Sequence, residues 1–245
     1  MSDAIILGIL IFAVAVLYSS VGQAGGTGYL AAMAFVGIAP DAMRPAALAL
    51  NVIVAAIATL RFWQAGQVSV RRLWPFLVAS IPLAYIGGSI DLSEDIYNPV
   101  VGVVLLLVAL RMFVPVRRHA QTADVGIPHA WAIGSGGAIG LLSGLTGTGG
   151  GVYLGPLLVL TGWVAGGMLA GTTATFNLVN SGAALAGNLL NVGSLPAAFS
   201  LWAVAALSGG FIGSSFGSRR LDSLMTQRVL AVILLAAGLR LLLFS

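Results

Sequence analysis

The stretch from Ala130 to Ser218 contains no acidic, basic or histidine side chain. A transmembrane helix needs only about 20 predominantly apolar residues, so this stretch is long enough to hold several. Across all 245 residues only 7% are charged, against about a quarter in ordinary soluble domains. Because a backbone inside lipid must satisfy its own hydrogen bonds, we expect the spans to be helical. The sequence therefore predicts an all-α integral membrane protein with several spans.

The two halves of the chain resemble each other. The hexapeptide GGTGYL at residues 25–30 matches GGGVYL at residues 149–154, a separation of 124 residues. More pairs follow in the same order, with a separation that rises only to 129: Asn51 with Asn177, Gly66 with Gly193, Ile86-Gly87 with Ile212-Gly213, and Leu110-Arg111 with Leu239-Arg240. This pattern predicts one membrane repeat at residues 1–118 and a second at residues 130–245, joined by a cytoplasmic linker at residues 119–129.

Each half divides into five apolar segments. They cover residues 4–20, 28–39, 43–60, 73–90 and 97–114, and then residues 130–146, 152–165, 168–190, 196–217 and 227–244. The second segment of each half is short and follows a glycine-rich break. At about 1.5 Å per residue it barely crosses a hydrocarbon core of about 30 Å, so we expect a broken or re-entrant helix there. The first segment begins with Asp3 and lacks the basic start of a signal peptide, which predicts a structural helix.

Arginine placement predicts the orientation of the halves, because short cytoplasmic loops are rich in basic residues. Pairs of arginines lie between segments three and four, five and six, and nine and ten: Arg71-Arg72, Arg117-Arg118 and Arg219-Arg220. All three loops share the cytoplasmic side only if each half crosses the membrane an odd number of times. That number is five, or three if the first two segments form a re-entrant hairpin. The second half is then inserted upside down, which predicts the inverted repeat of many secondary transporters.

The two glycine-rich breaks form the predicted binding site. A break leaves the next helix with free N–H groups and a partial positive charge, which suits an anion. Polar side chains lie beside the breaks or in the segments that follow them. The predicted substrate-binding residues are Gln23, Gly25, Gly26, Thr27, Asn51, Thr148, Gly149, Gly150, Gly151, Thr172, Thr173 and Asn177.

Other glycines are expected to pack helices together, and one arginine is expected to act outside the glycine breaks. Glycines at four-residue spacing are expected to pack helices together, namely Gly140 with Gly144, Gly209 with Gly213, and Gly162 with Gly166. Arg44 stands at the start of the third segment. There it is expected to attract anions or to extend toward lipid headgroups.

Composition excludes several classes of function. The chain has no cysteine, and His119 and His129 give no spaced set of metal ligands. It has no lysine for a P-loop, and its 11 arginines lie in short segments between apolar runs, unlike a nucleic-acid-binding face. A nucleophile, a base and an orienting acid cannot be assembled within the spans. We therefore expect no enzymatic activity, no metal, no cofactor and no nucleic-acid partner.

The segments SVGQAGGTGYLAAMAFVGIAP and SGLTGTGGGVYLGPLLVLTGW resemble the sulfite exporter TauE/SafE family of membrane permeases. The second copy is the closer match, through GTGGGVYLGPL at residues 147–157 and GTTATFN at residues 171–177. The resemblance implies a multi-pass protein of the bacterial inner membrane that moves sulfite, sulfoacetate or other organosulfonates. The first copy has Thr27 in place of the third glycine and Pro45-Ala46-Ala47 in place of GTT. The first half is therefore expected to serve more as scaffold than as site.

These observations predict a secondary transporter that binds a small sulfur-containing anion at a central site between the two repeats and alternates its access. Two alternatives stay open: an anion channel, and a ten-helix inverted-repeat exporter of another metabolite. No carboxylate lies within the spans, so uniport and coupling through protonation of the substrate are both compatible with the sequence. The predicted partners are the anion and the lipid bilayer. Homo-oligomerisation, the identity of the anion and the direction of transport are left open.

Overall fold

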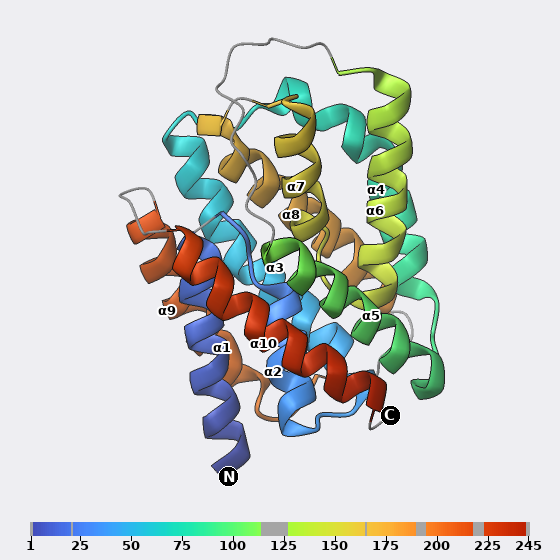
Figure 1. The fold of residues 1–245 in the computed structure, drawn as a ribbon, viewed down its shortest axis with the longest axis vertical. Helices are drawn as coiled ribbons and strands as arrows, with labels where there is room; N and C mark the ends of the chain where they lie inside the picture. Colours follow the sequence, from blue (N-terminus) through green and yellow to red (C-terminus); the bar gives the residue numbers. More distant parts are fainter. Residues whose placement is uncertain are drawn as a thin grey trace.

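The computed structural model describes residues 2–20, 22–113, 127–164, 166–189, 195–217 and 223–243. These residues contain ten α-helices and no strand (Figure 1). In chain order the helices are α1 (Ser2–Ser20), α2 (Gly26–Val36), α3 (Pro40–Gln64), α4 (Val70–Ser89), α5 (Glu94–Phe113), α6 (His129–Thr146), α7 (Gly151–Thr161), α8 (Gly166–Asn188), α9 (Phe199–Gly217) and α10 (Ser223–Leu243). The ten predicted segments are confirmed as helices, one for one.

Several sequence-based expectations lie outside the described residues. They concern the pairs Arg117-Arg118 and Arg219-Arg220, together with His119 and Gly193. Most of the predicted linker at residues 119–129 lies there too. Its last residue, His129, is the first residue of α6.

The outer surface of the helices is apolar. By length and composition, two of the described helices are able to cross a membrane, Asp3–Ser20 and Pro40–Gln64, and four shorter apolar stretches accompany them. Large hydrophobic side chains are exposed on most helices, among them Ile9, Leu60, Leu107, Trp131 and Val204. So many exposed large hydrophobic side chains are unusual for a soluble monomer. The exterior is therefore suited to lipid.

The two short helices, α2 and α7, have the same length and the same glycine ends. Each has 11 residues, which rise about 16 Å and cross only about half of a hydrocarbon core. Gly25 and Gly37 flank α2 at φ 101° and 83°, and Gly150 and Gly162 flank α7 at φ 83° and 66°. Glycine adopts positive φ without the steric cost of a side chain. The two helices thus correspond at a separation of 125 residues, one more than the GGTGYL and GGGVYL alignment predicts.

Helix contacts recur when the two halves are exchanged. Helix α1 packs on α9 as α6 packs on α4, and α3 packs on α9 as α8 packs on α4. The contact of α2 with α3 corresponds to that of α7 with α8, while the pairs α3–α8 and α5–α10 map onto themselves. The largest departure from this pattern is the contact of α10 with α2. In Figure 1, α10 runs obliquely across the bundle and packs on α2, whereas the described part of the chain has no contact of similar extent between α5 and α7.

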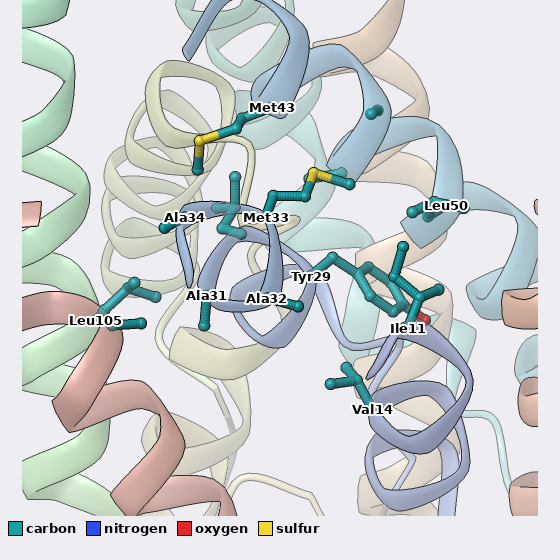
Figure 2. Close-up of a cluster of buried hydrophobic side chains, with 14 of the residues drawn as sticks. Ile11, Val14, Tyr29, Ala31, Ala32, Met33, Ala34, Met43, Leu50 and Leu105 are labelled. Carbon is teal, nitrogen blue, oxygen red and sulfur yellow. The ribbon is translucent and has the colours of Figure 1, made fainter. Parts of the chain in front are cut away.

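The short helices differ in how completely they are buried. Helix α2 is buried from Gly26 through Ala34, whereas α7 buries only Gly151, Leu154, Gly155 and Leu158. The largest core cluster surrounds α2 with side chains of α1, α3, α5, α9 and α10. Figure 2 shows Tyr29 and Met33 of α2 close to Ile11 of α1 and Met43 of α3. Helix α2 is therefore enclosed on all sides, as expected for a helix without a polar face.

Glycines bring two other pairs of helices into close contact. A Cβ at Gly140 or Gly144 of α6 would lie 2.4 or 2.3 Å from a backbone oxygen of α4, and a Cβ at Gly213 of α9 would lie 2.2 Å from the Val16 oxygen of α1. These contacts confirm the packing expected from four-residue glycine spacing. The expectation is wrong for Gly162, which ends α7 at positive φ and where an added Cβ would meet nothing within 4 Å.

Candidate functional site

A small polar cavity lies at the first glycine break. Its lining comes from the end of α1, the break itself, the start of α2, and the second half: Tyr18, Gln23, Ala24, Gly25, Gly26, Thr27, Thr148, Val152 and Asn177. It has room for about a single water molecule. Every polar side chain in this lining is a hydroxyl or an amide. Both halves of the chain therefore contribute to one uncharged site.

The first turn of α2 has unpaired donors, and two of its residues, Gly26 and Thr27, line this cavity. The N–H groups of Gly26, Thr27 and Gly28 have no acceptor among the described residues, and the first backbone bond of the helix runs from Tyr29 N to Gly25 O at 2.9 Å. The Thr27 hydroxyl lies 2.9 Å from the Tyr18 hydroxyl. Free N–H groups at a helix start carry a partial positive charge that attracts anions. This turn therefore places the partial positive charge of a helix start beside the cavity.

The second glycine break is filled by amide side chains. The Gly151 N–H donates to Asn177 Oδ1 at 3.2 Å, and Asn51 Nδ2 lies 3.3 Å from the Thr148 carbonyl oxygen. A Cβ at Gly149 would lie 1.8 Å from Asn51 Nδ2 and 2.4 Å from Asn177 Oδ1. The glycine at residue 149, at φ 87°, is thus required by the close approach of these side chains. The break binds the protein's own amides and leaves little room for a ligand.

Asn51 and Asn177 form a reciprocal pair between α3 and α8. Each Nδ2 lies 3.4 Å from the Oδ1 of the other residue. Asn51 Nδ2 also lies 3.0 Å from the Ser181 hydroxyl. Both asparagines are buried, and the sequence repeat matches them to each other. The pair therefore joins equivalent positions of the two halves.

A chain of hydroxyl groups orients Thr148 beside the cavity. The Thr148 hydroxyl lies 2.9 Å from that of Thr146 and donates to the Tyr153 hydroxyl at 3.1 Å. The Tyr97 hydroxyl of α5 donates to the Thr146 carbonyl oxygen at 3.0 Å. Position and rotamer of Thr148 are therefore fixed by residues of α5, α6 and α7.

Thr172 and Thr173, which were predicted to bind substrate, lie away from the cavity lining. The Thr172 hydroxyl accepts from the Ser69 N–H at 3.5 Å, next to the connection between α3 and α4. The Thr173 hydroxyl donates to the Leu169 carbonyl oxygen at 2.9 Å and lies 3.4 Å from the Gly22 carbonyl oxygen. The structure thus places Thr172 apart from the other predicted residues and Thr173 against the first break.

Two residues at the breaks were absent from the predicted set. Tyr18 lines the cavity, and only its position two residues before the end of the first apolar segment hinted at this. Asn180 is fully buried with its Nδ2 unpartnered, and that atom would lie 2.6 Å from a Cβ at Gly150. Its Oδ1 accepts from the Ser80 hydroxyl of α4 at 2.6 Å. The polar run from Thr172 to Ser181 signalled such a residue without singling it out.

Arg44 does not extend toward lipid headgroups, which was one of the two expectations from sequence, and it does not line the cavity. It is 4% exposed, and its guanidinium donates to four backbone carbonyl groups. The acceptors are the Gly144 oxygen of α6 at 3.0 Å, the oxygens of Ile90 and Gly88 at 2.7 Å each, and that of Gly87. Carbonyl groups at helix C-termini carry a partial negative charge. The arginine therefore ties the ends of α4 and α6 to the start of α3.

The position of the second half that is equivalent to Arg44 holds a small apolar residue. Counting from the pair Asn51 and Asn177, Arg44 corresponds to Ala170. A Cβ at Gly147 would touch Arg44 Cγ at 3.3 Å, and a Cβ at the equivalent Gly22 would meet Ala170 Cβ at 2.4 Å. The same glycine contact is thus made in both halves, but only the first half supplies an arginine.

Comparison with known proteins identifies the family. The sequence profile described as sulfite exporter TauE/SafE matches residues 7–241, nearly the whole chain. The chain belongs to the TauE/SafE family. A curated relative from Sinorhizobium fredii (strain NBRC 101917 / NGR234), named "Probable membrane transporter protein y4hK", is 42% identical over 246 residues, which cover 98% of this chain and 99% of the relative. No solved structure matches the chain.

Membership of the TauE/SafE family supports membrane transport as the general function. The family and the relative are both described as transporters, which implies a protein that moves a substrate and is not an enzyme. The apolar exterior and the ten helices agree with a protein that works in the lipid bilayer.

Proposed function

We propose that the chain is a secondary transporter of small sulfur-containing anions, such as sulfite, sulfoacetate or other organosulfonates, in the bacterial inner membrane. The observation that carries this proposal is the uncharged cavity at the start of α2. Hydroxyl and amide groups from both halves line it, next to a helix turn whose first three N–H groups have no acceptor among the described residues. Oriented backbone N–H groups bind anionic oxygens well. The sulfur chemistry comes from the name of the family.

The two halves form an inverted repeat of multi-pass architecture in this proposal. Support comes from helix contacts that recur when the halves are exchanged and from the reciprocal amide pair at equivalent positions. Helices α2 and α7 are too short to span, which favours re-entrant hairpins formed by α1 with α2 and by α6 with α7. Three crossings per half then put all three arginine-rich connections on the cytoplasmic side.

Alternating access fits the size of the cavity. A cavity for about one water is smaller than sulfite, so the site must open before a substrate enters. The two breaks touch here, because a Cβ at Gly26 would lie 2.4 Å from the Thr148 carbonyl oxygen. Separating the breaks on one side at a time would expose the α2 donors to each side in turn.

Counterflow in proteoliposomes tests the proposal. Vesicles preloaded with unlabelled sulfite, sulfoacetate or methanesulfonate should accelerate the uptake of the same labelled anion, and the uptake should saturate. Linear, non-saturating flux without counterflow would instead indicate a channel. Exchange of an unrelated metabolite, with none of the sulfur anions carried, would favour the alternative exporter. The control variant is Gly182→Ala of α8, because a Cβ at Gly182 meets nothing within 4 Å.

A further inference from the structure

We propose that the substrate crosses as a monoanion, so that sulfite is carried as hydrogensulfite and its dianion is excluded. This inference rests on the proposed function and adds the charge state of the substrate at the same cavity. It follows from the balance of charge and of hydrogen-bonding groups around the start of α2.

The described residues that line the cavity supply no ionised side chain. The hydroxyls come from Tyr18, Thr27 and Thr148, and the amides come from Gln23 and Asn177. Arg44 is the single charged residue among the buried residues that the structure describes. Its guanidinium does not line the cavity and is bound to four carbonyl oxygens. A bound anion therefore meets dipoles only.

Dipoles alone favour one negative charge over two. The cost of removing an ion from water rises with the square of its charge, so a dianion costs about four times as much as a monoanion of the same size. The start of a helix offers the equivalent of about half a positive charge. Protein sites for doubly charged oxyanions usually add arginine or lysine. The α2 donors and neutral side chains offset only part of one negative charge, and a second charge is left without compensation.

One unsatisfied acceptor, on a residue that lines the cavity, points to a substrate with its own O–H group. The Oε1 atom of Gln23 is buried and has no hydrogen-bond partner, and Gln23 lines the cavity. A buried acceptor without a donor is costly unless a ligand or water satisfies it. Hydrogensulfite carries one proton that such an oxygen can accept, whereas the sulfite dianion and methanesulfonate carry none. The proton thus travels on the substrate, and each transported hydrogensulfite moves one negative charge.

The charge state is tested with wild-type protein in proteoliposomes at equal inner and outer pH. Labelled sulfite, methanesulfonate and sulfate are compared on the acid and alkaline sides of neutrality. Sulfite uptake should fall about tenfold for each pH unit above the pKa of hydrogensulfite, because the protonated fraction falls by that factor. Methanesulfonate, a monoanion throughout, should keep a constant rate, and sulfate, a dianion throughout, should not be carried.

The outcomes separate this inference from the proposed function. Sulfite uptake that stays constant or rises with pH, or sulfate carried as fast as methanesulfonate, overturns the monoanion proposal while leaving sulfur-anion transport intact. Failure of all three anions overturns the proposed function itself. The variant Gln23→Leu tests the acceptor: it should reduce the ratio of sulfite to methanesulfonate uptake several-fold at acid pH. An unchanged ratio contradicts a role for Gln23 in accepting the substrate proton.

Discussion

The two glycine breaks are equivalent in the repeat, yet one is open and the other is filled. At the start of α2 the N–H groups of Gly26, Thr27 and Gly28 have no acceptor among the described residues, and Gly26 and Thr27 line the cavity. At the start of α7 the Gly151 N–H is bound to Asn177, and Asn51 occupies the space beside Gly149. The same local structure thus leaves donors free in one half and binds internal amide groups in the other.

This difference changes the meaning of the glycine-rich motif. The second copy, with three adjacent glycines, resembles the family more closely and was expected to dominate the site. In the structure the first of these three glycines, Gly149, admits two asparagine side chains, which a Cβ would displace. The first copy has Thr27 at the third position, and that residue lines the cavity. A richer glycine motif therefore reflects close packing here more than ligand binding.

The largest expected effect concerns the arginine that only one half supplies. Arg44→Leu leaves four backbone carbonyl groups at the ends of α4 and α6 without a donor. We expect a loss of about 4 kcal/mol in stability, since each buried unpaired acceptor is costly. Thermal unfolding in detergent measures it, with the exposed Arg71→Leu as the control. A melting temperature for Arg44→Leu equal to that of the control would refute the role of Arg44 as a clamp.

Gly149→Ala tests whether the second break is filled. Its Cβ would overlap Asn51 Nδ2, and its φ of 87° disfavours any side chain. We expect destabilisation by about 3 kcal/mol from overpacking and backbone strain. Gly182→Ala, with open space at its Cβ, should be nearly neutral. Equal melting temperatures for the two alanine variants would show that the amides leave more room than we infer.

Thr27→Val tests the open break without changing the shape of the side chain. It removes the hydroxyl that pairs with Tyr18 and faces the cavity. Losing one hydrogen bond to an anion, worth about 1.5 kcal/mol, should lower the affinity for methanesulfonate about tenfold, as measured by the half-saturating concentration for uptake. Thr161→Val, at the end of α7, is the matched control. An equal loss in both variants would argue against a special role for the first break.

The smallest effect is the coupling between Asn51 and Asn177. Their reciprocal contact should give an interaction free energy of about 1 kcal/mol in a double-mutant cycle with alanine. The cycle uses unfolding temperatures of the two single variants and the double variant in detergent. Additive effects would mean that the two halves are not joined through this pair.

The helices and their glycine ends were predictable from the sequence, because apolar segments in a membrane protein end where glycine or charge appears. The register between the halves was predictable to within one residue. Sequence identity pairs Tyr29 with Tyr153, whereas the flanking glycines Gly25 and Gly150 set the true correspondence. The alignment of identical residues and the alignment of equivalent backbone positions therefore differ by one residue.

The sequence did not predict that the first break has free donors beside a cavity while the second break is filled by amide side chains. This difference depends on Asn51 of α3 and Asn177 of α8, which approach the second break across long sequence separations. The partners of Arg44 are backbone oxygens up to 100 residues away. Every residue has a carbonyl group, so the sequence does not indicate which of them will accept a hydrogen bond. The candidate hydrogen-bond donors could be predicted from side-chain chemistry. Which of them line a cavity depends on how the helices pack.

The central claim is that the anion binds at the first break, and Gly26 and Gly151 test it as a matched pair. Each is the first residue of its short helix, but only Gly26 lines the cavity. Both alanine variants are reconstituted after confirming a single monodisperse species in detergent, and methanesulfonate counterflow is measured. We predict that Gly26→Ala abolishes counterflow, because its methyl group points at the Thr148 oxygen across the cavity, and that Gly151→Ala retains most of it. Loss of counterflow in Gly151→Ala with retention in Gly26→Ala would contradict the account.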